Sequence, residues 1–499
     1  MITPEEIWRT AGLPARRLAG LALNPAAPED ILLRLLADGP PAARMVLCRD
    51  RTLPDAVVDA VVAHPDRYTR SFFARNPHAD PAQRARLLDD PEWFVRAHLA
   101  DAPRMPGGVR PRPLPDQAVV HMILTYEQEF LDTLYRQASP GLMESMRTHP
   151  EPKVRRMGVF WRGVPDEARE ALLADPDDEV RDAVRRHLRS EDPAWTEREL
   201  PDRPCHGRTH LLMHCALSRG VVEGVLNAPV GEGDRWTIAG NPTLPADVVV
   251  LLAADADPEV RERIAYRSDL GPEERRALAA DTDPRVRLAL SVHPALSEAE
   301  RAAIDYEVPV DGVFGPALQH LVPRDPAAVR RDALSGHPLL RRRAARDHGL
   351  PSDLVPRLAV DDDLGVRVLL AQNHPEAPAE LLLSAFLEYT GPERELLLAR
   401  PRFPTAGLAR YARHEDPAVR ALATRDPAAA AGTVDRLTRD LEPGVREAAA
   451  RHPNLPRARL AELLDDAELA HHAAANPALA PDVMRRLVAC LPLPDGAAG

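Results

Sequence analysis

The sequence predicts an all-α fold, a solenoid of about eighteen repeats that each contain two helices and span 26 residues. The first observation behind this prediction is an arginine that returns every 26 residues, with a step of 27 at one place and three gaps of about two steps. A fixed period of this size is typical of stacked supersecondary units. The periodic arginines are Arg44, Arg70, Arg96, Arg155, Arg181, Arg235, Arg261, Arg287, Arg341, Arg367, Arg394, Arg420 and Arg446.

The second observation is a phrase that surrounds each of these arginines. Residues 255–268 read DADPEVRERIAYRS, and residues 414–429 read HEDPAVRALATRDPAA. Between two such phrases lie stretches such as LPADVVVLLAADAD at 244–257, which start with Leu-Pro and continue with aliphatic residues. The repeat therefore covers nearly all of the chain and leaves no room for a separate catalytic domain.

The first helix of each repeat is expected to begin at the proline of Leu-Pro. Pro245 and Pro456 fit the first helical position, because proline lacks only an N–H that would be unbonded there and its φ is already helical. Apolar residues then follow at spacings of three and four, as in Val248, Leu251 and Leu252. Such a stripe buries one face of a helix.

The second helix of each repeat is expected to begin at Asp-Pro, as in Asp257-Pro258 and Asp283-Pro284. The aspartate can accept a backbone N–H as an N-cap, and the proline sets the first turn. This helix should be about ten residues long. The next Asn-Pro or His-Pro should end it, because the residue before a proline is disfavoured in the helical region.

These phrases resemble the leucine-rich repeat variant family and, more distantly, the HEAT and armadillo solenoids. Residues 241–297 and 416–480 carry the resemblance best. It implies a right-handed superhelix of paired short helices. The founding type of the family has a cysteine-rich iron–sulfur segment before its repeats, whereas the first cysteine here is Cys48, alone and inside a repeat. We therefore expect the fold of the family and no cofactor.

The breaks in the repeat predict how the chain is organised. The two largest are a Pro/Gly/Arg loop followed by an apolar helical stretch, and a segment rich in Gly and Pro that could be a degenerate repeat or a hinge. The predicted segments are a capping helix and first partial repeat at 1–23, repeats at 24–102, the insertion at 103–138, repeats at 139–302, the degenerate repeat or hinge at 303–324, repeats at 325–490 and a disordered tail at 491–499.

Composition restricts the partners and the compartment. The net charge is −12, so general binding to nucleic acid backbones is not expected. The four cysteines are scattered and favour a reducing compartment. No signal sequence and no apolar run of eighteen residues is present, so we expect a cytoplasmic protein that does not cross a membrane.

The periodic arginines have two possible roles. One arginine per repeat on the same helix face could form a ladder that binds an acidic peptide or a nucleic acid. Alternatively, each arginine could pair with an aspartate of its own or the adjoining repeat, such as Asp257 or Asp283, and stabilise the turn between helices. We favour the structural role, because aspartates recur together with the arginines.

One cluster has residue types that zinc prefers, namely Cys205, His206, His210, His214 and Cys215. The three histidines are four residues apart, which would place them on one face of a helix. In the repeat register, however, His214 occupies the ordinary Asn/His position and Cys215 the proline position, so a helix should end there. We therefore favour a degenerate repeat and do not expect one continuous helix through all three histidines.

The sequence favours a non-enzymatic scaffold that binds a protein or peptide along the concave face of the array. The partner-binding candidates are Arg341, Arg342, Arg343, Arg346, Tyr126, Phe130, Tyr135 and Phe314. Two alternatives stay open. One is a HEAT-like nucleic-acid-binding protein with a DNA-repair role, in which Trp93, Trp161, Trp195 and Trp236 could stack on bases. The other is a regulator that carries a metal or cluster.

Overall fold

The computed structural model describes residues 12–103, 111–126, 131–228, 234–308 and 325–491. All regular elements in these ranges are helices, which confirms the predicted all-α solenoid class. The chain divides into two compact units. Unit 1 contains residues 1–162 and 405–499, and unit 2 contains residues 163–404.

Unit 1 is built from both ends of the chain. Its described helices are α2 (Leu13–Leu23), α3 (Glu29–Asp38), α4 (Pro41–Arg49), α5 (Asp55–Val62), α6 (Arg67–Ala74), α7 (Pro81–Ala85), α8 (Trp93–Asp101), α9 (Asp116–Thr125), α10 (Leu131–Leu134), η3 (Tyr135–Gln137), α11 (Pro140–Ser145), η4 (Met146–Thr148), α12 (Pro152–Arg162), η9 (Leu408–Tyr411), α29 (Pro417–Leu422), η10 (Ala423–Arg425), α30 (Ala431–Leu437), α31 (Pro443–Ala450), α32 (Arg457–Leu464), α33 (Ala470–Ala474) and α34 (Pro481–Val488).

Unit 2 continues the same pattern of short helices. Its described helices are α13 (Asp166–Leu173), α14 (Asp178–Leu188), η5 (Arg189–Glu191), α15 (Pro193–Glu199), α16 (His206–His214), α17 (Arg219–Asn227), α18 (Asp234–Ala239), α19 (Ala246–Ala253), α20 (Pro258–Ala265), α21 (Pro272–Ala279), α22 (Pro284–Ser291), α23 (Glu298–Ala302), α24 (Pro326–Leu334), α25 (Pro338–Arg346), η7 (Ser352–Leu354), α26 (Val355–Leu358), α27 (Leu364–Asn373), α28 (Ala379–Glu388) and η8 (Arg394–Ala399).

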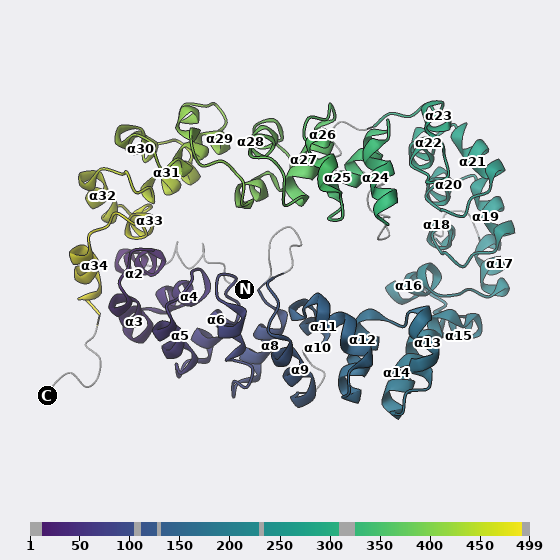
Figure 1. The fold of residues 1–499 in the computed structure, drawn as a ribbon, viewed down its shortest axis with the longest axis horizontal. Helices are drawn as coiled ribbons and strands as arrows, with labels where there is room; N and C mark the ends of the chain where they lie inside the picture. Colours follow the sequence, from purple (N-terminus) through teal and green to yellow (C-terminus); the bar gives the residue numbers. More distant parts are fainter. Residues whose placement is uncertain (1–11, 104–110, 127–130, 229–233, 309–324, 492–499) are drawn as a thin grey trace. The chain divides into compact units, whose positions relative to one another are not determined.

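The repeats have two helices each, as α19 with α20 and α21 with α22 illustrate (Figure 1). The second helix starts where the sequence predicts, with Pro258 as the first residue of α20. The first helix starts one residue later than predicted. Pro245 is the N-cap of α19, with an extended ψ of 143°, because the φ of proline also suits the extended residue before a helix. The second helix is also shorter than predicted, with eight residues in α20.

The aspartate before each of these prolines is an N-cap, as predicted. The side chain of Asp257 accepts the backbone N–H of Glu259 at 2.9 Å, and that of Asp283 accepts the N–H of Arg285 at 2.8 Å. Asp416 caps α29 in the same way. These bonds satisfy N–H groups that the first turn of a helix leaves without a partner.

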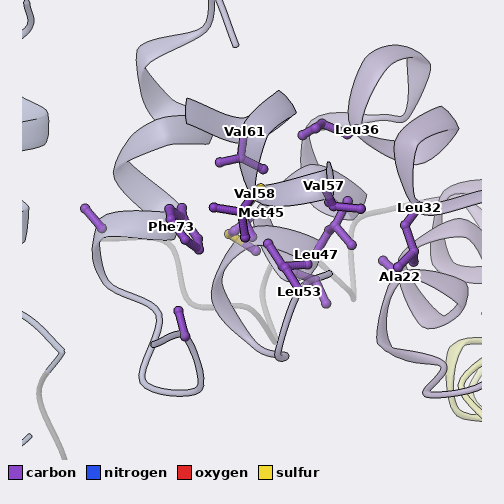
Figure 2. Close-up of a cluster of buried hydrophobic side chains, with 14 of the residues drawn as sticks. Ala22, Leu32, Leu36, Met45, Leu47, Leu53, Val57, Val58, Val61 and Phe73 are labelled. Carbon is purple, nitrogen blue, oxygen red and sulfur yellow. The ribbon is translucent and has the colours of Figure 1, made fainter. Parts of the chain in front are cut away.

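The core of unit 1 consists of thin aliphatic layers between successive helices. Figure 2 shows part of it, where Val57, Val58 and Val61 of α5 lie near Met45 and Leu47 of α4. All five side chains are buried. The same core cluster continues into α32, α33 and α34, so the first and last repeats of the chain share one core.

A repeat-type contact joins α2 to α33, and we call this contact the terminal joint. Asn24, which follows α2, donates from Nδ2 to the carbonyl oxygens of Ala474 at 2.9 Å and Asn476 at 2.7 Å. Asn76 makes the corresponding bonds to the preceding repeat, with Cys48 at 2.7 Å and Arg51 at 2.8 Å. The last repeat of the chain therefore stacks on the first as consecutive repeats stack on one another.

The predicted segment boundaries stay predictions. Inside the predicted insertion at 103–138, the apolar stretch forms α9, followed by α10 and η3. Parts of the predicted capping helix, hinge and tail fall at 1–11, 309–324 and 492–499, which lie outside the described residues. Among the described helices, none has both the length and the apolar character that crossing a bilayer requires.

Candidate functional site

The periodic arginines are engaged in contacts within the chain, and Arg261 on α20 shows the geometry. Its Nε and Nη2 donate to the two carboxylate oxygens of Asp281 at 2.8 and 2.9 Å. Its Nη1 donates to the backbone oxygens of Asp255 at 2.8 Å and Ala256 at 3.2 Å. The guanidinium thus connects its own repeat to the next one, and it holds the pKa of the Asp281 carboxyl below its usual value.

The same arrangement recurs along both units, so these arginines act as braces between repeats. The aspartate lies six residues before the periodic arginine of the following repeat, whereas the sequence suggested the capping aspartates Asp257 and Asp283. The matching pairs are Arg70 with Asp90, Arg235 with Asp255, Arg341 with Asp361 and Arg420 with Asp440, and glutamates Glu388 and Glu468 take the place of aspartate for Arg367 and Arg446.

The predicted arginine cluster on α25 is largely engaged as well. Arg341 pairs with Asp361, Arg342 with Asp363 at 2.7 Å and Arg343 with Asp332 at 2.7 Å. Arg342 is only 3% exposed, so these residues do not form a continuous solvated helix face. Arg346 is exposed. Because three of the four guanidinium groups already bind carboxylates, we do not base a binding surface on this cluster.

The aromatic candidates of the insertion are partly buried. The hydroxyl of Tyr126 donates to Asp89 at 2.8 Å, and the guanidinium of Arg96 lies 4.6 Å from the centre of its ring. Tyr126 and Tyr135 both pack against the core of unit 1. The other two aromatic candidates, Phe130 and Phe314, lie outside the described residues.

The cysteine and histidine cluster lies on α16. This helix runs from His206 to His214 without interruption, contrary to our expectation, although it ends at Cys215 as the repeat register predicted. His206 and His214 are about 12 Å apart along the axis at 1.5 Å per residue, too far to bind one ion. Cys215 is buried, and burial raises the pKa of its thiol. In the part of the chain that the structure describes, no three His, Cys, Asp or Glu side chains are grouped to hold a metal.

A cluster of aromatic side chains on α6 and α8 includes two of the exposed large apolar residues of unit 1. Tyr68 is 49% exposed and Trp93 is 50% exposed. The rings of Tyr68 and Phe94 meet edge to face at 5.7 Å. Phe72 and Arg75 follow Tyr68 at helical spacings, and the Arg75 guanidinium lies 5.4 Å from the centre of the Phe72 ring. We call these five residues the aromatic surface.

Neighbouring contacts hold the aromatic surface in place. Asp66 caps α6 by accepting the N–H groups of Tyr68 and Thr69. The hydroxyl of Ser71 lies 2.8 Å from Nδ1 of His98 and connects α6 to α8, as the pair of Arg70 and Asp90 also does. The surface is therefore built on two braced helices.

Arg75 differs from Arg261 and the other arginines that brace the repeats, because no carboxylate pairs with it in the described ranges. Its Nε donates only to the backbone oxygen of Ser71, at 3.4 Å. Burial, together with the nearby charge of Arg49, lowers the pKa of the Arg75 guanidinium. A half-buried cation of this kind is a position where an acidic group from another molecule would be stabilised.

Sequence reasoning singled out Trp93 as a residue that could stack on bases, but it missed the rest of the aromatic surface. A usable signal was present, because Tyr68 and Phe94 are 26 residues apart and occupy the same position in consecutive repeats. The other three tryptophans named from the sequence lie on other helices, with Trp195 on α15. Trp161 donates to the Leu131 carbonyl on α10, and Trp236 of α18 is 39% exposed under the guanidinium of Arg263.

No curated protein matches the chain. The crystal structure of an engineered protein covers 99% of this chain and 97% of its own at 14% identity, with a TM-score of 0.11, and a superposition this poor carries no argument. The model of the leucine rich repeat variant family matches residues 443–468, which include α31. This match confirms, over one 26-residue repeat, the resemblance to the leucine-rich repeat variant family that the repeated phrase predicted.

Proposed function

We propose that this chain is a non-enzymatic helical-repeat scaffold of the cytoplasm that binds another protein, and that the aromatic surface is its principal contact. The observation that carries the proposal is the edge-to-face contact between the half-exposed Tyr68 of α6 and Phe94 of α8, which adjoins the half-exposed Trp93 in the sequence. Arg75 of α6 has no acidic partner in the described residues. Tyr, Trp and Arg are the residue types that contribute most binding energy at protein interfaces.

The chemistry of the surface specifies the partner. Aromatic rings bring a large apolar area to an interface and lose little conformational entropy, because each has only two side-chain torsions. Arg75 adds a fixed positive charge beside Phe72. We therefore expect a partner segment with an apolar or aromatic residue and an acidic residue close to it, so that the carboxylate pairs with Arg75.

The test is site-specific photo-crosslinking in the native host. A photoreactive phenylalanine analogue replaces Tyr68 in one version of the chain. In the matched control it replaces Leu441, which is 95% exposed in the same unit but away from the aromatic surface. We expect one protein to be crosslinked from position 68 and not from position 441. Substituting Trp93→Ala should abolish that crosslink, and with the purified partner it should weaken binding by about 30-fold or more.

Two results would contradict the proposal. One is a crosslinked protein that is captured equally from both positions, since this would show contact without a specific site. The other is crosslinked material that nuclease removes, since this would identify a nucleic acid partner in spite of the net charge of −12.

A further inference from the structure

A cleft of about 620 Å³ lies in unit 2 between α20, α23, α24 and α25. Its apolar lining comes from Pro294, Leu296, Leu334 and Leu340, together with the ring of Tyr266. Leu334 is 46% exposed and is therefore accessible to a bound molecule. The volume is within the range of roughly 300 to 1,000 Å³ that ligand sites occupy.

Most charges in the cleft already cancel within the chain. Arg301 lies 3.3 Å from Glu298, and Arg343 lies 2.7 Å from Asp332. Glu298 also accepts hydrogen bonds from the Ser335 hydroxyl at 2.9 Å and from the N–H of Gly336. These two arginines and two carboxylates add no net charge to the cleft.

Arg331 is the exception in this lining. It is exposed on α24, and in the described part of the chain its side chain has neither a carboxylate nor a hydrogen-bond partner. The preceding residue, Arg330, is fully engaged, with Asp353 at 2.7 and 2.8 Å. The cleft therefore presents apolar walls together with one uncompensated positive charge.

We propose that this cleft binds an apolar group that carries one negative charge, supplied by a protein segment in which a large apolar side chain is next to a carboxylate. The apolar walls would provide most of the affinity, and the fork of Arg331 would orient the carboxylate. The protein source of the ligand rests on the proposed scaffold function. The cleft itself is separate from the aromatic surface and is tested separately.

The experiment compares two fluorescent probes that share an apolar body, using the full chain. Anilinonaphthalene sulfonate carries one negative charge, and phenylnaphthylamine carries none. Arg331→Gln removes the proposed anion contact, and Arg330→Gln on the same helix is its matched control. Leu334→Asp places a charge on the apolar wall. Circular dichroism of each variant verifies that it is folded.

We expect the anionic probe to bind saturably. Arg331→Gln should weaken its affinity by about 5- to 10-fold, whereas Arg330→Gln should change its affinity by less than about twofold. The affinity of the neutral probe should be the same in both arginine variants and in the unchanged chain. Leu334→Asp should lower the affinity for both probes. A short peptide that ends in leucine with a free carboxylate should displace the anionic probe, whereas its amide should not.

The proposal is wrong if the anionic probe does not saturate, or if the two arginine variants change its affinity equally. It is also wrong if Leu334→Asp has no effect, since the probe would then bind elsewhere. None of these results bears on the crosslink from position 68 in unit 1, so failure here and failure of the scaffold proposal are distinguishable.

Discussion

The periodic arginines explain how repeats this short remain stacked. In each brace that resembles Arg261, the guanidinium divides its donors between a carboxylate of the next repeat and carbonyl oxygens of its own repeat. The aspartates have a matching double role, because Asp281 binds Arg261 with its side chain and accepts Arg287 Nη1 with its carbonyl oxygen at 2.8 Å. The Asp281 side chain also accepts the N–H of Asp283 at 2.9 Å. Consecutive braces are therefore linked through the same turns.

Removing one brace should be costly. In Arg261→Met, the half-buried carboxylate of Asp281 loses its partner, and two carbonyl oxygens lose their donor. We expect a loss of about 2 to 3 kcal/mol in the free energy of unfolding. The matched control is Arg285→Met, because Arg285 pairs with Asp283 while 53% exposed, and its loss should cost less than about 1 kcal/mol. Urea unfolding monitored by circular dichroism measures both, and equal losses would refute the brace.

At the scale of the element, α33 shows how a helix can carry buried histidines that remain neutral. The centres of the His471 and His472 rings lie 3.5 Å apart. Burial, together with the charges of Arg451 and Arg16, lowers the pKa of His471 to about 4. Burial, together with the charges of Arg451 and His471, lowers the pKa of His472 to about 2. The carboxylate of Glu447 lies 3.5 Å from His472 Nε2.

Acid should therefore weaken the packing of α33. In the unfolded chain the two histidines bind protons below their ordinary pKa of about 6.5, whereas in the folded chain they stay neutral down to about pH 4. Stability contributed by the neutral form is complete above pH 6.5 and is lost as the pH falls toward 4. The slope should approach about 1.4 kcal/mol per pH unit for each histidine.

The measurement is the midpoint of urea unfolding at several pH values between 7 and 4.5. His472→Leu should flatten the decline. His206→Gln, a change at an exposed histidine of α16, should not alter the decline of the midpoint with falling pH. An identical decline in all three proteins would show that other groups cause the acid sensitivity.

At the scale of the whole chain, the terminal joint gives each end a partner. Repeat arrays ordinarily require capping repeats, because the outer face of the last repeat would expose its core. Here α2 and α33 cover each other, and the backbones approach closely at Gly20. A Cβ at this position would overlap the carbonyl oxygen of His471. Glycine is needed at this position because any side chain would push the two helices apart.

Gly20→Ala should open the terminal joint. We expect faster hydrogen exchange in both α2 and α33, although these helices are at opposite ends of the sequence. Gly432→Ala is the matched control, because a Cβ at Gly432 of α30 meets no atom within 4 Å. That change should be neutral or stabilise the chain by about 0.5 to 1 kcal/mol. Exchange that accelerates in α2 alone would show that the two helices do not depend on each other.

Much of the fold was predictable, because the signals that define it act over a few residues. Asp257 and Pro258 specify where a helix starts whatever surrounds them, and the 26-residue period implies stacking. Pro245 was predicted to be the first residue of its helix, but it is the N-cap. Proline is compatible with both positions, so the sequence alone does not distinguish them. The aromatic surface was harder to find, since Trp93 and Tyr68 look like ordinary core residues until exposure is known.

The sequence by itself determined the helical repeats, their caps and the recurrence of one arginine and one aspartate in each. Only the tertiary structure decided which aspartate each arginine binds, that Asn24 meets the last repeat, and that Arg331 rather than Arg330 is left without a partner among the described residues. Caps and periodicity depend on torsions and hydrogen bonds within one turn of a helix. Contacts between residues 20 or 450 positions apart depend on how small rotations between repeats accumulate, and no local pattern encodes that sum.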